Sequence, residues 1–427
     1  MDWQRRFAPK IVDAQEAVSR IMRGSRVFIG TGCGEPQHLI RAMVKDERLQ
    51  DIMVYQMLSS TLSQFVEDES FIRRFSLKLF FISQSMRKAA FDGKIDYIPE
   101  YLSQIPRLFA SHQIGLDAAL VQVSPPDKFG YCSLGVSVDI TRSAVEHAAV
   151  VIAQVNPRMP RTWGDSFVHV DDIDWLVPHE EALVEALPKV KDNEVARRIG
   201  HYVSELVDDG ATLQIGFGSL PYTIIKYLDS KQDLGIHTQL ITDGLLPLFE
   251  KNVITNKKKT LLPGRVVSSL CMGSEKIYRY VDNNPAFYFR SSEFVNDPTV
   301  IARNDNLVSI SSALEIDLTG QVCSDSMGYL FYSGIGDQVD FLRGSSMSNG
   351  GFYMAPAEDT VFHIKCQNMY EGNLSADALG VTACLYAYSN LSFSLSDIAR
   401  EYARHYHLLR EYSMEHAEVQ EILGATD

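Results

Sequence analysis

Two similar stretches lie 186 residues apart in the chain, and this repeat limits its possible folds more than any other feature. The first, Gly24–Gly34, reads GSRVFIGTGCG, and the second, Gly210–Leu220, reads GATLQIGFGSL. In both, a short apolar run ends in a Gly-x-Gly turn, and a proline (Pro36 or Pro221) then opens a helical stretch. Self-similarity at a fixed distance indicates a repeated structural unit.

A second pair of segments repeats at nearly the same distance. Asp127–Ser133 and Asp317–Cys323 share the pattern Asp-x-x-Gly, 190 residues apart. Two matched anchors predict two related α/β halves, residues 1–190 and 191–427. We place the boundary in the charged, proline-bearing stretch Pro178–Asn193, just before the second copy.

Apolar runs alternate with helical periodicity along both halves, which favours open, mainly parallel sheets with helical crossovers. The predicted buried strands are Ile52–Met57, Leu77–Ile82, Ala118–Val123, Val150–Val155, Leu213–Ile215, His237–Thr242, Val266–Leu270 and Val308–Ile310. The predicted helices are Gln15–Arg23, His38–Lys45, Ser143–Ala148, Asn193–Val207 and Leu395–Leu409.

Composition excludes several classes of protein. Of the 427 residues, 45% are hydrophobic and 22% are charged, which is typical of a globular protein. No apolar run reaches membrane-spanning length, and the N-terminus lacks the apolar core of a signal peptide. The net charge of −14 argues against nucleic acid as the main partner. Six scattered cysteines without Cys-x-x-Cys spacing fit reduced thiols in a cytoplasmic protein better than disulfides or metal ligands.

The two Gly-x-Gly turns have different expected roles. Gly30 and Gly32 are best interpreted as a tight turn that needs positive φ. In Gly216–Leu220, backbone amides converge at a helix start, where a pyrophosphate or an extended cofactor could pack. The pattern is neither a dinucleotide fingerprint nor a P-loop, because the third glycine of the one and the Gly-Lys-Ser/Thr of the other are missing.

A second glycine-rich segment is Ser333–Phe341, in which Gly334 and Gly336 could direct two amides at one point. That is the geometry of an oxyanion hole, although an ordinary turn is the simpler interpretation. The basic run Lys257–Lys259 is expected to be a solvated loop. No histidine or carboxylate spacing predicts a metal site.

Several long motifs closely resemble the acetyl-CoA hydrolase/transferase family, a branch of the family I coenzyme A transferases that includes the 4-hydroxybutyrate CoA-transferases. The resemblance covers roughly residues 10 to 351 and rests on the motifs Ser124–Gly135, Asn156–Asp165, Gly216–Pro221, Gly235–Gly244, Val253–Thr260 and Tyr332–Phe341. It implies two open-sheet α/β domains that bind an acyl-CoA between them.

In this family a glutamate attacks the thioester to give an acyl-glutamyl anhydride and then a glutamyl-CoA thioester. The corresponding segment here is His237-Thr238-Gln239, so glutamine stands at the nucleophile position. Gln239 could be natural, could be an engineered substitution that traps a substrate complex, or could be replaced in function by another carboxylate. Glu293 is the first substitute to test, although an acidic residue in the first turn of a helix is its simpler interpretation.

The resemblance thus implies an acyl-CoA:carboxylate CoA-transferase-like protein. It would hold the cofactor with Gly216, Phe217, Gly218, Ser219 and Leu220, face the thioester carbonyl with Gly334 and Gly336, and carry Gln239 at the catalytic position. An acyl-CoA hydrolase and a non-catalytic acyl-CoA binding or regulatory module are the alternatives. The expected partners are acyl-CoA and a small carboxylate, without metal, nucleic acid or membrane, and homo-oligomerisation stays open.

The resemblance ends near Gly350 and Gly351. Beyond them we expect a strand within Ala355–Lys365 and a terminal helix from Leu395 onward, and the stretch between them has no clear pattern. Some members of the family continue into an acetyltransferase domain, so the chain could be a fragment of a longer protein.

Overall fold

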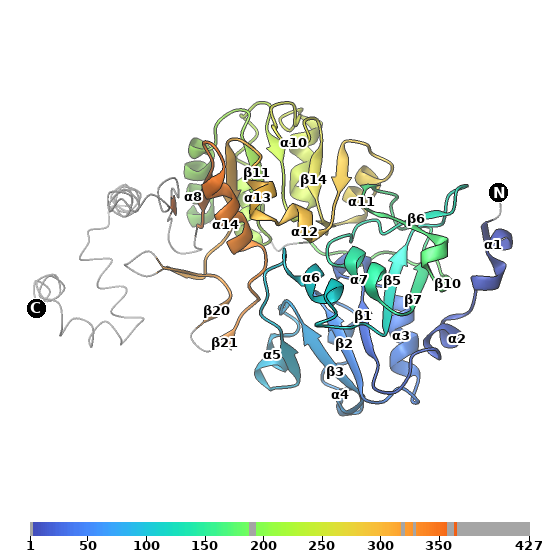
Figure 1. Ribbon diagram of the computed structural model, residues 1–427. Coiled ribbons are helices and arrows are strands. Elements are labelled where there is room, and N and C mark those ends of the chain that lie inside the picture. The colour runs from blue at the N-terminus through green and yellow to red at the C-terminus, as the bar shows by residue number, and fades with distance from the viewer. Residues whose placement is uncertain (1–2, 188–193, 317–320, 328–329, 357–362, 365–427) are drawn as a thin grey trace, which may run out of the picture.

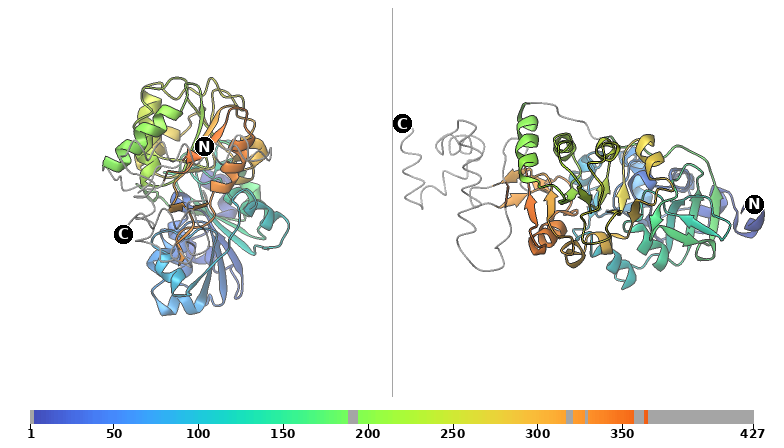
Figure 2. Two further views of the ribbon diagram at one scale, coloured as in Figure 1. Left: turned by 90° about the vertical axis from the view of Figure 1, so that its left-hand side faces the viewer. Right: turned by 90° about the horizontal axis from the view of Figure 1, so that it is seen from above.

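The computed structural model describes residues 3–187, 194–316, 321–327, 330–356 and 363–364 (Figure 1). Two α/β halves lie one above the other in Figure 1 and in the left view of Figure 2, with the N-terminal half in blue to cyan below. The predicted repeat element Asp317–Gly320 and the predicted helix Leu395–Leu409 lie outside the described residues.

The N-terminal half contains a parallel sheet of seven strands in the order β10-β7-β5-β1-β2-β3-β4. Its strands are β1 (Arg26–Ile29), β2 (Ile52–Gln56), β3 (Phe75–Leu79), β4 (Ile95–Tyr97), β5 (Ala118–Val123), β7 (Val151–Val155) and β10 (Trp175–Pro178). Every residue of β5 and β7 is buried, as expected of strands covered on both faces. The four strands predicted in this half are confirmed.

Short helices cover this sheet. They are α1 (Trp3–Arg6), α2 (Ala14–Val18), α3 (Gln37–Lys45), α4 (Glu69–Arg74), α5 (Arg87–Phe91), α6 (Ile105–Ala110) and α7 (Thr141–His147), beside an antiparallel pair of strands, β6 (Tyr131–Ser133) and β9 (Phe167–His169). The prediction of a helix over Gln15–Arg23 was too long. The amides of Arg20 and Ile21 bond to carbonyls only three residues back, so α2 gives way to tight turns.

The C-terminal half repeats this strand order around its own first strand. A five-stranded sheet has the order β12-β11-β17-β22-β23, in which only β23 is antiparallel. A parallel bridge between His237 and Val267 joins β12 to the small sheet β14-β16-β8. The strands are β8 (Trp163–Gly164), β11 (Thr212–Ile215), β12 (Gly235–Ile236), β14 (Val266–Ser268), β16 (Phe287–Phe289), β17 (Leu307–Ile310), β22 (Phe352–Met354) and β23 (His363–Ile364).

In both halves the first strand is therefore central. β2, β3 and β4 follow on one side of β1, as β12, β14 and β16 follow on one side of β11. The chain then returns to the other side with β5 and β7, or with β17 and β22. Each Gly-x-Gly turn leaves the carboxyl end of its central strand at the point where strand order reverses, which is where open α/β sheets bind ligands.

The helices of this half are α8 (Glu194–Leu206), α9 (Ser219–Ile225), α10 (Leu246–Glu250), α11 (Glu275–Val281), α12 (Ser292–Val295), α13 (Pro298–Ile301) and α14 (Gln338–Met347). Two antiparallel pairs, β18 (Glu315–Ile316) with β19 (Val322–Cys323) and β20 (Ser326–Met327) with β21 (Leu330–Phe331), precede α14. Five 3₁₀ turns complete the described elements, at Ala8–Lys10, Gly32–Gly34, Leu62–Gln64, Val170–Asp172 and Asp243–Leu245.

The predicted strand His237–Thr242 is interrupted. β12 ends at Ile236, His237 makes only an isolated bridge, and the next strand is the short β13 (Leu240–Ile241), which pairs with β15 (Leu270–Cys271). The carbonyl of Gln239 accepts hydrogen bonds from two successive amides, Ser269 at 3.1 Å and Leu270 at 2.9 Å. Two residues therefore oppose one, which is the geometry of a β-bulge and explains the break.

The halves share one junction. The largest cluster of buried apolar side chains includes Phe28 of β1 and Phe287 of β16, so it runs through both halves. β8 lies in the N-terminal half of the sequence but pairs with β16 of the C-terminal half. The amides of Val138 and Asp139 both donate to the carbonyl of Ser269 at 3.1 Å. The elements around Gln239 are therefore in contact with both the N-terminal and the C-terminal half.

Candidate functional site

The turn Gly216–Leu220 lies at the carboxyl end of β11, beside the end of β17. The Gly216 amide donates to the Ile310 carbonyl at 2.7 Å, and a Cβ on Gly216 would meet Ile310 O and Ser311 Cα at 3.3 Å. Gly218 has φ +145°, which side chains rarely allow. Phe217 between them is 49% exposed. The turn therefore presents accessible backbone that only glycine permits.

The corresponding turn of the N-terminal half is closed. Residues 31–36 are all buried. A Cβ added to Gly32 would lie 3.4 Å from the sulfur of Met272, which belongs to the C-terminal half. The Ser137 hydroxyl donates to the Thr31 carbonyl at 3.0 Å. A Cβ on Gly34 would come within 2.5 Å of Ser137. This turn is filled by protein, which supports the structural interpretation of Gly30 and Gly32.

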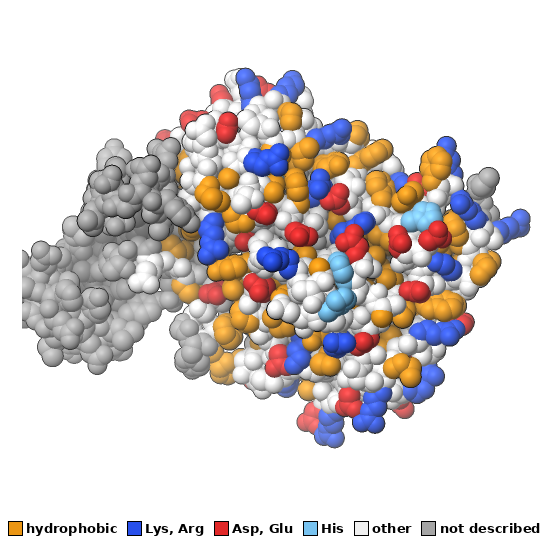
Figure 3. Space-filling view, in the orientation of Figure 1, with side chains coloured by type: hydrophobic (Ala, Val, Ile, Leu, Met, Phe, Trp, Pro, Cys, Tyr) orange, Lys and Arg blue, Asp and Glu red, His pale blue; other side chains and the backbone are white. Residues whose placement is uncertain are grey.

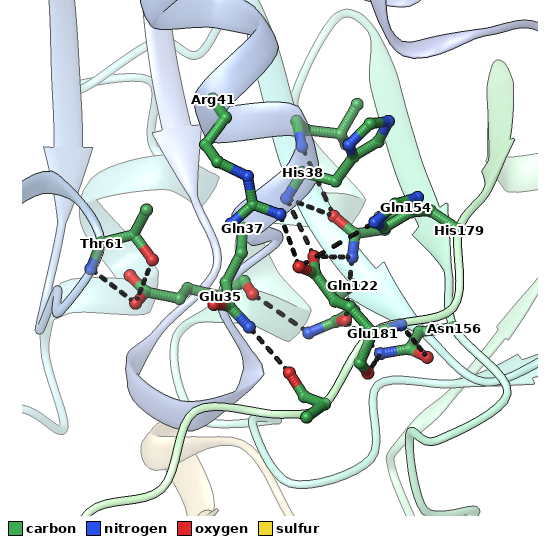
Figure 4. Close-up of polar contacts among 12 residues, drawn as sticks. Glu35, Gln37, His38, Arg41, Thr61, Gln122, Gln154, Asn156, His179 and Glu181 are labelled. Atoms are coloured by element: carbon green, nitrogen blue, oxygen red, sulfur yellow. Dashed lines mark hydrogen bonds and ion pairs between the residues drawn. The ribbon is translucent and has the colours of Figure 1, made fainter.

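Buried polar side chains fill the space behind that closed turn (Figure 4). The Glu35 carboxylate accepts from the amide and hydroxyl of Thr61, both at 2.8 Å, and from the Ser59 hydroxyl at 2.9 Å. Gln122 of β5 donates to the Glu35 carbonyl at 3.0 Å. Burial raises the pKa of Glu35, and its hydrogen bonds oppose the rise.

The segment 179–187 contacts both halves, and Figure 4 shows its Glu181 beside Gln154 and Asn156. Glu181 accepts from Arg41 at 2.5 Å and from Gln154 at 2.7 Å, both in the N-terminal half. Further along, the hydroxyl of Tyr278 donates to the Val184 carbonyl at 2.7 Å in the C-terminal half. This connection fixes the relative position of the halves before residue 188.

His237, Thr238 and Gln239 follow β12 beside the end of β11. His237 is fully buried, and one ring nitrogen lies 2.8 Å from the Val295 carbonyl. Burial lowers the pKa of His237 to about 3, so the ring is neutral. The Thr238 hydroxyl bonds both to the carbonyl of Ile215 at 3.2 Å and to its amide at 3.3 Å. Gln239 is thereby held next to the residue that precedes Gly216.

The backbone of Gln239 is fixed more firmly than its side chain. Besides the two amides of the bulge, the hydroxyls of Ser268 and Ser269 donate to its carbonyl at 2.9 and 3.0 Å. The residue is half-buried, and its side-chain amide makes no hydrogen bond to a described residue. Position 239 is therefore rigid in the main chain and has a side chain free to meet a ligand.

The glycine segment after β21 packs against the N-terminal half. The Ser333 carbonyl accepts from the Ile82 amide at 2.9 Å, and the Ile335 amide donates to the Tyr97 hydroxyl at 2.9 Å. A Cβ on Gly334 would meet Phe80 O at 3.1 Å, and Gly336 has φ +61°. Within the described ranges, the amides of Gly334 and Gly336 have no acceptor.

One strand end connects these three segments. Gln214 of β11 donates to the Asp337 carboxylate at 3.1 Å, directly after Gly336. The next residue, Ile215, holds Thr238, and Gly216 then starts the accessible turn. The turn Gly216–Leu220, position 239 and the start of α14 after Gly336 are thus all attached to the carboxyl end of β11.

Other candidates are less well placed. Glu293 is exposed in the first turn of α12, as its simpler interpretation predicts. Burial raises the pKa of the Cys33 and Cys132 thiols to about 12, so neither is a thiolate. In the described ranges no three His, Cys, Asp or Glu side chains gather in a way that could hold a metal ion. No described helix is long and apolar enough to cross a bilayer.

The prediction that Lys257–Lys259 form a solvated loop fails at one residue. Lys259 is 4% exposed, and its ammonium donates to the carbonyls of Ile236 at 2.7 Å and Arg265 at 2.8 Å. Burial lowers its pKa to about 7. Lys259 fills the space that Gly235 leaves open, because a Cβ there would lie 2.4 Å from Lys259 Cγ. The prediction of a solvated loop is wrong for this residue.

Sequence reasoning also missed the polar partners of the glycine segment. Gln214, Tyr97 and Ser103 were not singled out, and Asp337 and Asp340 were only part of the quoted motif. Burial raises the pKa of Asp337 to about 6 and that of Asp340 to about 7. The available signal was the spacing of two acidic residues three apart at the start of a helix.

Comparison with known proteins matches both halves. Residues 1–188 match the acetyl-CoA hydrolase/transferase N-terminal domain, and residues 273–361 match the C-terminal domain of the same family. The 4-hydroxybutyrate coenzyme A transferase of Clostridium kluyveri is 44% identical over 352 residues, 82% of each chain. The crystal structure of 4-hydroxybutyrate CoA-transferase from Porphyromonas gingivalis matches with a TM-score of 0.72 at 31% identity, over 90% of this chain and 96% of that one.

The C-terminal segment resembles a different family. Residues 338–427 match an antirestriction protein family. The antirestriction protein KlcA of Escherichia coli is 42% identical over 85 residues, which is 19% of this chain and 58% of that protein. This match overlaps the end of the CoA-transferase match at residues 338–361.

The agreement of sequence and structure over both halves confirms the resemblance and the two-half α/β fold that it implied. The chain belongs to the acetyl-CoA hydrolase/transferase family.

Proposed function

We propose that the chain binds an acyl-CoA thioester at the carboxyl end of β11. Its cofactor would pack against Gly216–Leu220, and its thioester carbonyl would face the amides of Gly334 and Gly336. The observation that carries this proposal is the common attachment of all three segments to Gln214, Ile215 and Gly216. Support also comes from the accessible backbone of the turn, which only glycine allows.

The bound thioester would lie between the halves. The glycine segment is held by Tyr97 and Ile82 of the N-terminal half, while the turn and Gln239 belong to the C-terminal half. A relative named butyryl-CoA:acetate CoA-transferase has an acyl-CoA and a carboxylate in its name, and we extend this pair of substrate classes to the chain. The same strand order in both halves supports our proposal of an internal duplication, with halves at residues 1–190 and from 191 onward.

Gln239 decides how far the reaction proceeds. A carboxylate at this position would attack the thioester carbon and release CoA thiolate, leaving an acyl-glutamyl anhydride. The thiolate would then attack the glutamyl carbonyl and release the acyl group as a carboxylate. A neutral amide cannot perform the first step efficiently. We therefore propose that the chain binds acyl-CoA with little transferase activity.

The alternatives are a thioester hydrolase and a purely binding or regulatory module. Incubation with acetyl-CoA, with and without a carboxylate acceptor such as butyrate, separates them by the release of free CoA and the formation of a new acyl-CoA. Acceptor-dependent turnover identifies a transferase and acceptor-independent release of CoA a hydrolase. Binding by calorimetry without turnover identifies the binding module that Gln239 favours. Absence of binding would refute the proposed site.

The segment 338–427 favours a second function within the same chain. Its relatives are named antirestriction proteins, and we propose that this segment opposes DNA restriction. Expression of the chain in a restricting host should then raise the plating efficiency of unmodified phage. A chain ending after residue 361 is the matched control, and equal plating with both would contradict the proposal.

We also propose a cytoplasmic protein, since the four cysteines in the described part of the chain are all free thiols. Acidic and basic side chains alternate over the face shown in Figure 3, without the basic patch that a nucleic-acid partner would need. Self-association stays open and is measurable by light scattering.

A further inference from the structure

Two aspartates at the start of α14 join the glycine segment to both halves. Asp337 and Asp340 are three residues apart and so lie on one face of the helix. Asp337 bonds to Gln214 of the C-terminal half, whereas Asp340 bonds to Ser103 of the N-terminal half. The start of α14, which follows Gly336 directly, is therefore fixed by contacts on two sides.

The contact between Ser103 and Asp340 is buried and uses both oxygens of the carboxylate. Oδ1 accepts from the Ser103 hydroxyl at 2.9 Å and Oδ2 from the Ser103 amide at 3.0 Å. Asp340 is 2% exposed and Ser103 is 4% exposed. The Ser103 amide can only donate, whereas its hydroxyl can donate to an ionised carboxylate or accept from a protonated one, so both forms of Asp340 can make this contact.

We propose that Asp340 is a positioning residue, which through Ser103 holds the two halves together and places the Gly334 and Gly336 amides where they meet the thioester carbonyl. This inference rests on the proposed function of those amides. The other attachments of the segment to the two sheets include the bonds of Ser333 to Ile82, of Ile335 to Tyr97 and of Asp337 to Gln214. Of the bonds to the N-terminal half, only that of Asp340 involves a carboxylate.

Burying a carboxylate at the contact between two surfaces costs free energy, because the charge loses its hydration. Burial is the largest influence on Asp340 and raises its pKa to about 7, with a further rise from Asp337, while the bonds of Ser103 and the charge of Arg343 oppose it. Stability alone would be served as well by apolar packing. The carboxylate is better explained by the fixed geometry that its two bonds impose on the junction.

The contact between Ser103 and Asp340 should depend on pH. Separation of the halves would expose Asp340 and lower its pKa toward the ordinary value near 4, so the closed form takes up a proton between these two values. The closed form is therefore favoured at lower pH, weakens as the pH rises from about 4 to about 7 and changes no further above that.

The ionisable groups around Asp340 come from its own helix and from the elements packed against it. Asp337 and Arg343 lie on its own helix, and Arg343 stacks 5.1 Å from the ring of Tyr101. The ring of His237 packs 6.1 Å from Phe341 and stays neutral. Arg107 of α6 bonds to Gln104. The other elements against α14, which are α13, β17 and β22, add only the phenol of Tyr353.

The test measures acetyl-CoA binding and amide exchange in the full chain. The parent, Asp340→Asn and Ser103→Ala are compared by calorimetry between pH 5.5 and 8.5, and by hydrogen exchange of residues 333–337 without ligand. Because Gln239 is a poor nucleophile, turnover should not disturb the binding measurement. Ser103→Ala keeps the carboxylate and serves if Asp340→Asn does not fold.

Asp243→Asn is the matched control. Asp243 accepts from the amide and hydroxyl of Ser274 in the same way, but both residues belong to the C-terminal half. Any pH dependence that the ligand itself brings will also appear in this variant.

We expect the parent affinity to fall several-fold as the pH rises from 5.5 to about 7 and to level off above it, with exchange of residues 333–337 becoming faster over the same range. Asp340→Asn can bond to Ser103 as the protonated acid does, so it should keep at every pH the affinity and slow exchange that the parent has at pH 5.5. Ser103→Ala should bind about tenfold more weakly at pH 6 and exchange faster. Exchange in Ser103→Ala as slow as in the parent at pH 6, or a pH dependence of exchange in Asp340→Asn equal to that of the parent, would overturn the inference, whether or not ligand binds. Absence of acetyl-CoA binding by the parent would instead overturn the proposed function, and the exchange data would still decide the role of Asp340.

Discussion

The side chain of Gln214 donates a hydrogen bond of 3.1 Å to the carboxylate of Asp337 and connects the central strand of the C-terminal half to the start of α14. Its carbonyl oxygen lies 2.5 Å from the hydroxyl of Ser309, so both ends of the amide are used. Gln214 is fully buried, and its bond links the strand before the accessible turn to the residue that follows the glycine pair.

Gln214→Leu should therefore destabilise the chain. The change leaves the Asp337 carboxylate without its donor, at a cost of about 1–3 kcal/mol for an unsatisfied buried group. Urea unfolding followed by circular dichroism measures this cost. Gln214→Glu, which keeps the shape but places two carboxylates together, should be worse at pH 8 than at pH 5. Equal stability of the parent and both variants would show that the bond does not hold α14.

Gly218→Val should weaken acetyl-CoA binding by about 1–3 kcal/mol, because a side chain would occupy the accessible face of the turn. Isothermal calorimetry measures the change. Gly24→Val is the matched control, since Gly24 also has positive φ, no atom lies within 4 Å of its added Cβ, and it precedes β1 of the other half. Both variants should lose similar stability, and only the first should lose affinity. Normal affinity in a folded Gly218→Val would contradict the cofactor turn.

Lys259 should make the stability of the chain depend on alkaline pH. Its pKa is about 7 when folded and near 10.5 when unfolded, so the unfolded chain binds more protons between these values. Stability should therefore rise with pH from 7 toward 10 through this group, by roughly 2 kcal/mol between pH 7 and 9. Lys259→Met should lack that rise. A parallel pH dependence of the parent and Lys259→Met in urea unfolding would show that the amine is not buried as described.

Gln239→Glu should raise acceptor-dependent turnover of acetyl-CoA. The loss of a nucleophile should cost at least as much as the loss of an oxyanion-hole donor, about 10²–10³ in rate. Measured release of CoA with an acceptor present should rise by at least this factor. If the parent already turns over as fast, the nucleophile lies elsewhere, and Glu293→Gln is the next variant to compare.

Much of the architecture was predictable from the sequence. The repeat of Gly24–Gly34 at Gly210–Leu220 and the apolar runs identified both sheets, because buried parallel strands such as β5 leave a continuous apolar signal. The break at Gln239 was not predictable, since it depends on Ser269 and Leu270, about thirty residues away, sharing one carbonyl. Local periodicity contains no information on such a bulge.

The backbone requirements of the candidate site were predictable where glycine marks them. Gly216, Gly218, Gly334 and Gly336 were identified because their conformations or close contacts exclude side chains. The contact between Ser103 and Asp340 could not be predicted, because it joins residues 237 positions apart in different halves. The burial of Lys259 could not be predicted for a similar reason. Lys257 and Lys258 before it are exposed, so the run as a whole has the pattern of a solvated loop, whereas Lys259 packs against Gly235.

The most direct test of the account is the mass of the covalent adduct formed with acetyl-CoA. Gln239→Glu should gain the mass of one coenzyme A less one water, and peptide mapping should locate it on the peptide that contains position 239. The parent chain should gain nothing. An adduct of the parent chain, or one located on the peptide that contains Glu293, would contradict the assignment of position 239 as the nucleophile position.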